Sequence, residues 1–123
     1  MAKSYLGTTL GTLKAFSGKN NMTPTQKSLR HMRAQGFFCE VVEHWVAFPR
    51  PGHRKDLLGF IDILCLRGNE TVAVQATSRS NVTARRKKIL CHPNLAAWLA
   101  PTRKLEIHGW KKGSMEPMIV VIP

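Results

Sequence analysis

Acidic residues are scarce in this chain of 123 residues, in which 7 Asp and Glu stand against 19 Lys and Arg and give a net charge of +12. Such an excess raises the self-repulsion of the compact state, and it is typical of proteins that bind a polyanion. Nucleic acid is the partner that this charge favours, with an anionic membrane surface as the alternative. The chain also lacks an apolar run of the ~20 residues that a spanning helix needs, so we expect no membrane-spanning segment.

Cysteine is sparse as well, and the three cysteines Cys39, Cys65 and Cys91 show no CxxC spacing. Their apolar neighbours predict small buried thiols in a reducing, cytoplasmic compartment. The histidines form no HxH or HExxH pattern, so no structural zinc site is expected. The N-terminal stretch has no acid and no apolar core of a secretory signal. We therefore expect a flexible basic arm at 1–21 and a single domain at 22–123.

A helix is predicted to begin near residue 23, because Thr23 and Gln26 have the types and spacing of a capping box, with a proline between them. Gly36 is placed to end this helix. Apolar periodicity and turn residues then divide the rest of the chain. The expected strands are 37–48, 59–66, 71–77, 105–110 and 118–122. The further expected helices are 82–92 and 95–100.

The strands at 59–66 and 71–77 are joined by a short turn, so they are expected to form an antiparallel hairpin. Residues 49–55 are rich in Pro and cations and are predicted to be a loop. Asn81 is a candidate N-cap for the helix that follows. Strands connected across a sheet by a helix indicate an α/β fold, with a mixed central sheet flanked by helices.

Two polar residues interrupt the apolar strands of this expected hairpin. Asp62 lies within GFIDIL, and Gln75 lies within VAVQAT. A carboxylate in such a segment is costly to desolvate unless it meets a cation or hydrogen-bond donors. We therefore interpret Asp62 as a functional residue and expect it to converge with Gln75 at one end of the sheet.

The order of these elements over 23–110 resembles the core of the PD-(D/E)XK nucleases, in particular the small Holliday-junction-resolvase and VRR-NUC-like members. That resemblance implies a restriction-endonuclease-like αβββαβ core. Asp62 matches the family Asp, Gln75 stands at the second acid and Thr77 at the Lys. Gln26, besides its capping role, stands where an early helix often adds a Glu. The resemblance further implies Mg²⁺ or Mn²⁺, cleavage of linear or branched DNA, and a homodimer.

The departures from the family pattern concern charge. Gln75 and Thr77 bring none, so a metal bound by Asp62 needs further carboxylates. Glu43 and Asp56 are the candidates to supply them. The predicted catalytic set is therefore these five residues, and the predicted metal ligands are Asp62, Gln75 and Glu43.

The segment SRSNVTARRKK follows the predicted site strand and combines hydroxyls, a helix start and five cations. Backbone N–H groups at a helix start bind anions, and Lys and Arg neutralise phosphates. Arg79, Lys87 or Lys88 can also return a cation to the site in place of the missing Lys. The predicted nucleic-acid contacts are Arg54, Lys55, Arg79, Asn81, Arg85, Arg86, Lys87 and Lys88.

Two further interpretations stay open. The uncharged Gln75 and Thr77 are also consistent with a catalytically inactive nucleic-acid-binding module on the same fold, which needs no metal. The other interpretation is a basic protein-interaction or ribosome-associated domain without any relation to nucleases. That last interpretation predicts that Asp62 and Gln75 lie far apart.

Overall fold

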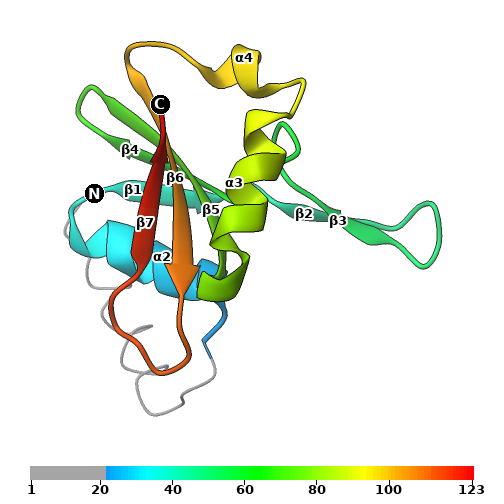
Figure 1. The fold of residues 1–123 in the computed structure, drawn as a ribbon, viewed down its shortest axis with the longest axis horizontal. Helices are drawn as coiled ribbons and strands as arrows, with labels where there is room; N and C mark the ends of the chain where they lie inside the picture. The colour runs from blue at the N-terminus through cyan, green and yellow to red at the C-terminus, as the bar shows by residue number, and fades with distance from the viewer. Residues whose placement is uncertain (1–21) are drawn as a thin grey trace.

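A mixed five-stranded sheet forms the centre of the computed structural model, which describes residues 22–123 (Figure 1). The predicted arm at 1–21 lies outside the described residues. The strand order is β1-β4-β5-β6-β7, with β5 and β6 parallel and the other neighbours antiparallel. Its strands are β1 (Phe38–Val41), β4 (Ile63–Arg67), β5 (Glu70–Ser78), β6 (Arg103–Trp110) and β7 (Met118–Ile122).

Helices cover both faces of the sheet, and a second, two-stranded sheet projects from its side (Figure 1). The predicted α/β class, with a mixed sheet flanked by helices, is therefore confirmed. The helices are α2 (Pro24–Ala34), the short 3-10 helix η1 (Arg79–Asn81), α3 (Val82–Leu90) and α4 (Leu95–Trp98). The projecting strands are β2 (His44–Val46) and β3 (His53–Lys55).

Helix α2 begins as its sequence predicts. The Thr23 hydroxyl accepts from the Gln26 N–H at 3.2 Å, and the Gln26 side-chain oxygen accepts from the Thr23 N–H at 2.9 Å. Both halves of the capping box are thus present, and the Gln26 carboxamide is used to start the helix. Gly36, with φ of 91°, follows the helix in the left-handed conformation that glycine adopts most readily.

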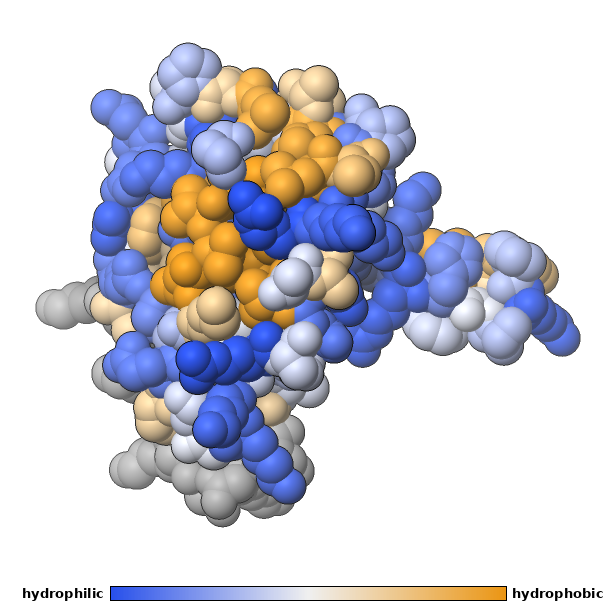
Figure 2. Space-filling view, viewed as in Figure 1, coloured by the Kyte–Doolittle hydropathy of each residue, from blue (hydrophilic) through white to orange (hydrophobic). Residues whose placement is uncertain are grey.

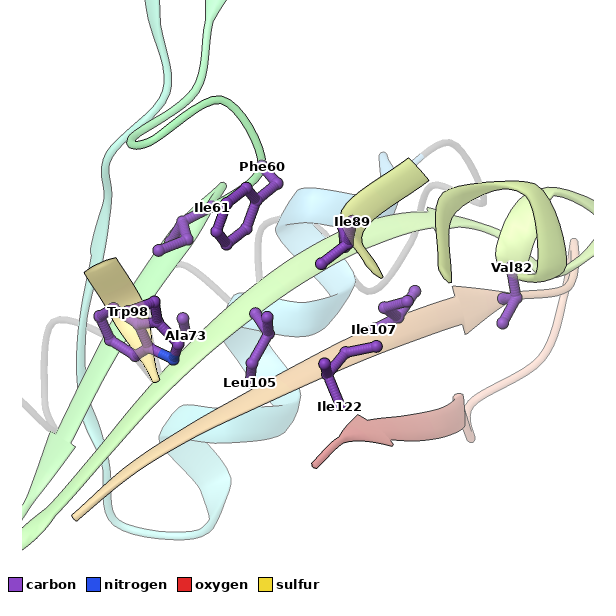
Figure 3. Packing of buried hydrophobic residues seen from close by; sticks show 9 residues of the cluster. All are labelled: Phe60, Ile61, Ala73, Val82, Ile89, Trp98, Leu105, Ile107 and Ile122. Carbon is purple, nitrogen blue, oxygen red and sulfur yellow. The ribbon is translucent and has the colours of Figure 1, made fainter. Parts of the chain in front are cut away.

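Two apolar cores fill the space between sheet and helices. The core on the α3 side is labelled in Figure 3 and consists of Phe60, Ile61, Ala73, Val82, Ile89, Trp98, Leu105, Ile107 and Ile122. The core on the α2 side consists of Met32, Phe37, Cys39, Ile63, Cys65, Val72 and Val74. Ala73 and Val74 belong to different cores because side chains alternate between the faces of β5.

The predicted strand at 37–48 is wrong as a single element. Its first part is β1, which pairs with β4, whereas its last part is β2, which leaves the main sheet and pairs with β3. Residues 53–55 are therefore strand rather than loop. Backbone hydrogen bonds between two segments of three residues decide this pairing, and no apolar alternation marked it in advance.

The second predicted strand begins later than expected. Leu58 and Gly59 have φ of 58° and 93°, and these left-handed torsions turn the chain before β4 begins at Ile63. The following hairpin of β4 and β5 is antiparallel, as predicted. Further along, Asn81 makes no capping hydrogen bond through its side chain, because its backbone is already helical, with φ of −97° and ψ of −2°. Helix α3 ends at Leu90 rather than 92.

The cysteines divide into two kinds. Cys39 and Cys65 are buried thiols that pair across β1 and β4, with their Sγ atoms 3.3 Å apart. Their burial confirms the prediction. Cys91 is exposed just after α3, so the expectation of burial is wrong for that residue.

Candidate active site

Three carboxylates meet where the projecting hairpin joins the sheet. Glu43 comes directly before β2, Asp56 directly after β3, and Asp62 directly before β4. One carboxylate oxygen from each lies within 4.8 Å of the others. The structure thus brings together Asp62 and the two acids that were predicted to supply further carboxylates.

Asp62 is held by the backbone on both sides. Its Oδ2 atom accepts from the Ala76 N–H at 2.9 Å, and its own N–H donates to the Val74 carbonyl at 2.9 Å. Its carbonyl accepts from the Val42 N–H at 2.8 Å. These bonds fix the carboxylate beside β5 while the residue remains only 4% exposed.

Burial raises the pKa of Asp62 to about 8. The Ala76 N–H opposes this shift, and the nearby Asp56 and Glu43 carboxylates add to it. At neutral pH the side chain is therefore mostly protonated in the absence of a cation. A cation at this spot reverses the balance, because it favours the ionised form of all three acids.

One nearby cation already contacts the cluster. The Arg54 guanidinium lies 2.8 Å from the Glu43 carboxylate, whose side chain is 12% exposed. Arg54 is 70% exposed and comes from β3. The sequence predicted Arg54 to be a nucleic-acid contact, and the structure pairs it with Glu43 of the acidic cluster.

The cluster fits a small divalent cation. Hard cations such as Mg²⁺ take carboxylate oxygens, and opposite ligands at about 2.1 Å from the ion lie about 4.2 Å apart. The present span of up to 4.8 Å needs only a small side-chain movement to reach that size. Glu43, Asp56 and Asp62 are therefore the residues that would hold such an ion.

Gln75 and Thr77 flank the Ala76 N–H that binds Asp62. They are 3% and 5% exposed and, by the alternation of β5, share the face of Ala73. Ile63 pairs with Val74, so Asp62 and Gln75 are the next residues on neighbouring strands. Among residues 22–123, no hydrogen bond joins the Gln75 or Thr77 side chain to another group. Both polar groups are thus buried without a hydrogen-bond partner in this part of the chain.

A basic cleft of about 630 Å³ begins on the same strand. Ser78 lines it, two residues and therefore about 7 Å along β5 from Ala76. The cleft is lined by Ser78, Arg79, Ser80, Trp110, Lys111 and Lys112. Of these, only Arg79 was predicted to contact nucleic acid. Parallel pairing explains the others, because Trp110 ends β6 beside Ser78.

The cations of α3 lie apart from the acids. Arg85 is half-buried and Arg86, Lys87 and Lys88 are exposed, while Val82 and Ile89 turn toward the sheet. Within the described part of the chain, none of these cations forms an ion pair with Glu43, Asp56 or Asp62. Their expected contact with phosphates stays a prediction, as does that of the exposed Asn81 and Lys55.

A Ser-His-Glu chain lies elsewhere in the molecule, and sequence reasoning did not find it. Ser28 Oγ lies 2.9 Å from His108 Nδ1, and His108 Nε2 lies 2.9 Å from Glu106. This is the connectivity of a hydrolase triad. However, Ser28 and His108 are both 0% exposed, and the Ser28 oxygen accepts from the Trp110 indole at 2.8 Å. The chain therefore joins α2 to β6 and is closed to substrate.

Comparison with protein-family models, curated proteins and solved structures found no match to this chain. The assignment of the site therefore depends on the geometry of its own residues. Within residues 22–123, no helix is both long enough and apolar enough to span a membrane.

Proposed function

We propose that this protein is a metal-dependent endonuclease that hydrolyses DNA phosphodiester bonds. The observation that carries this proposal is the buried Asp62 carboxylate, fixed by backbone hydrogen bonds within 4.8 Å of two more carboxylates. A net charge of +12 supports a polyanionic substrate. A basic cleft that begins at Ser78, two residues along β5 from the Ala76 N–H that binds Asp62, suits a reaction in which phosphates are held near a metal ion.

The arrangement of elements supports a core of the PD-(D/E)XK type. Helix α2, strands β1, β4 and β5, helix α3 and strand β6 occur in the expected αβββαβ order, with β2 and β3 inserted after β1, η1 after β5 and α4 after α3. Asp62 precedes the second of these strands, and Gln75 and Thr77 lie on the third. In this proposal Glu43 and Asp56 replace the carboxylate that the third strand lacks. A homodimer and a preference for branched DNA remain predictions from the resemblance.

Each side chain of the site would have a separate task. A bound Mg²⁺ or Mn²⁺ supplies polarisation of the phosphate and lowers the pKa of a bound water. Asp62 gives up its proton to become a ligand, and the Ala76 N–H keeps its carboxylate oriented. Glu43, whose carboxylate contacts Arg54, would be a further ligand of the ion. The Gln75 amide and the Thr77 hydroxyl lie on the same face of β5 and can orient a phosphate oxygen or a water.

A second candidate function is a nucleic-acid-binding module without catalysis. The observation that favours it is the chemistry of β5, which offers an amide and a hydroxyl where hydrolysis is best served by a carboxylate and an ammonium. This candidate predicts salt-dependent binding with no metal requirement.

Incubation of the purified protein with labelled linear and branched DNA separates the two candidates. The nuclease produces shortened strands in Mg²⁺ or Mn²⁺ and none in EDTA. The binding module shifts the DNA on a gel under both conditions and leaves its length unchanged.

Substitution of the cleft cations tests where the phosphates lie. We expect Arg79→Ala or Lys111→Ala each to weaken DNA binding at about 0.15 M salt and to reduce the slope of log K against log salt by about 1. Fluorescence anisotropy over a salt series in EDTA measures this. Lys104→Ala is the matched control, because Lys104 lies near Glu70 at 3.7 Å and does not line the cleft. A slope that changes equally in all three variants contradicts a phosphate site in the cleft.

A further inference from the structure

The projecting hairpin, defined as residues 44–55, exposes aromatic rings and cations together. Trp45 and Phe48 are 63% and 70% exposed. The hairpin also contains Arg50, Arg54 and Lys55 and no acidic residue. It stands away from the sheet in Figure 1, and Figure 2 shows hydrophilic residues over much of its visible surface. Rings and positive charge on one extended element suit a partner that offers both π faces and phosphates.

The Trp45 ring has a fixed position despite its exposure. A Cβ atom built on Gly52 would lie 2.6 Å from Cζ2 of Trp45, so the ring lies against the glycine backbone. Gly52 has φ of +92°, which also favours glycine at this position. A ring held on one side and open on the other loses little conformational entropy when it stacks on a ligand.

The same ring lies on the side of the hairpin that leads to the acidic cluster. Trp45 and Arg54 are directly opposite on β2 and β3, so their side chains share a face. Arg54 reaches Glu43 at 2.8 Å from that face. Glu43 is two residues from Trp45, or about 7 Å along an extended chain. A base stacked on Trp45 would therefore place an adjoining phosphate close to the carboxylates.

We propose that the projecting hairpin binds an unpaired nucleotide, with its base stacked on the exposed Trp45 and its backbone held by the exposed Arg50. Bases within a duplex are stacked on their neighbours, so a free π face requires a single strand, an end or a junction. This inference deepens the proposed nuclease function, since it names a single-stranded or splayed segment as the substrate beside Glu43, Asp56 and Asp62.

Intrinsic fluorescence tests the stacking directly. Of the three tryptophans, Trp98 and Trp110 are 7% and 5% exposed. Because Trp110 also lines the basic cleft, the quenching that reports on Trp45 is the part that a Trp45→Phe variant loses. Titration of the full chain in EDTA with a single-stranded oligonucleotide is expected to quench this emission. The same sequence as a blunt duplex quenches it much less. Equal quenching by both probes, or none by either, overturns the proposal.

Substitutions give the matching affinities. Trp45→Ala is expected to weaken binding of the single strand about 5- to 150-fold, while Trp45→Phe retains most of it. Duplex affinity should change less than about twofold. Val121→Ala, a 55% exposed apolar residue on β7, is the control. Because Trp45 is exposed, the fold should survive its replacement by Ala. Phe48→Ala provides a second variant of the projecting hairpin. Unchanged single-strand affinity in both hairpin variants assigns this surface to another kind of partner and overturns the inference.

A cleavage assay on the same oligonucleotides keeps the two proposals distinguishable. If Trp45→Ala and Phe48→Ala selectively lose single-strand binding but the wild type shows no metal-dependent cleavage, the hairpin proposal is retained and the nuclease proposal is rejected. Cleavage that Trp45→Ala and Phe48→Ala leave unchanged retains the nuclease and rejects the hairpin.

Discussion

An Asp62→Asn variant is expected to lose metal-dependent DNA cleavage by about 10³-fold or more. Asn keeps the size of the side chain and an oxygen that can accept from the Ala76 N–H, as Asp62 Oδ2 does at 2.9 Å. What it removes is the negative charge that a divalent cation needs in a cluster of three carboxylates. DNA affinity in EDTA at neutral pH should change little, because without a cation the Asp62 carboxyl is mostly protonated and Asn is neutral as well.

Glu40→Gln is the matched control for this loss. Glu40 is an exposed carboxylate on β1 and is not part of the acidic cluster, so the variant removes one charge elsewhere. Initial rates of cleavage in Mg²⁺ and in Mn²⁺ give the comparison. Residual activity within about tenfold of the wild type for Asp62→Asn would remove this carboxylate from the reaction.

The Asp62→Asn substitution is also expected to stabilise the metal-free protein at high pH. Folding raises the pKa of Asp62 to about 8, so the folded chain binds this proton more tightly than the unfolded chain does. That contribution to stability is complete below the unfolded pKa near 4, and it is lost as pH rises through about 8. Relative to wild type, Asp62→Asn should therefore gain about 2–5 kcal/mol in the free energy of unfolding between about pH 5 and pH 9.

Urea unfolding in EDTA at a series of pH values measures this gain. Glu40→Gln should follow the wild-type curve, since it leaves the cluster intact. A constant difference between Asp62→Asn and wild type across the range would mean that the buried acid keeps its ordinary pKa. A variant that is less stable at high pH would show that the ionised carboxylate supports the fold by itself.

The sequence contained the signals for the local elements and for one site residue. Thr23 and Gln26 predicted the start of α2, and the short turn before Glu70 predicted the pairing of β4 with β5. A single Asp within an apolar segment marked Asp62, which proves to be buried and held by the Ala76 N–H. These signals succeeded because each depends on residues close in sequence.

The remaining features depend on long-range geometry. Leu58 and Gly59 turn the chain before β4, so that Asp56 faces Asp62 instead of lying along the same strand. Pairing of β2 with β3 brings Glu43 to Asp56. Neither effect has a periodic signal in the sequence, because β2 and β3 have three residues each and turn residues lie close to them. Glu43 and Asp56 were candidates only through their acidity.

The basic cleft shows the same limit. Lys111 and Lys112 reach Arg79 because β5 and β6 are parallel and end together, with Ser78 paired to Trp110. A sequence search for basic runs instead selects the cations of α3, which follow one another along the chain. Of those cations, Lys87 and Lys88 lie on the side of the helix away from the buried Val82 and Ile89, whereas Arg85 and Arg86 flank the buried face.

Anomalous diffraction from crystals soaked in Mn²⁺ tests the central claim most directly. The predicted result is a peak bound by the carboxylates of Glu43, Asp56 and Asp62 at about 2.0–2.3 Å, with the Arg54 contact to Glu43 released. The peak should be absent from Asp62→Asn crystals soaked in the same way. A map with no ion between these carboxylates, or with manganese bound only elsewhere, would contradict the metal centre and with it the proposed hydrolysis.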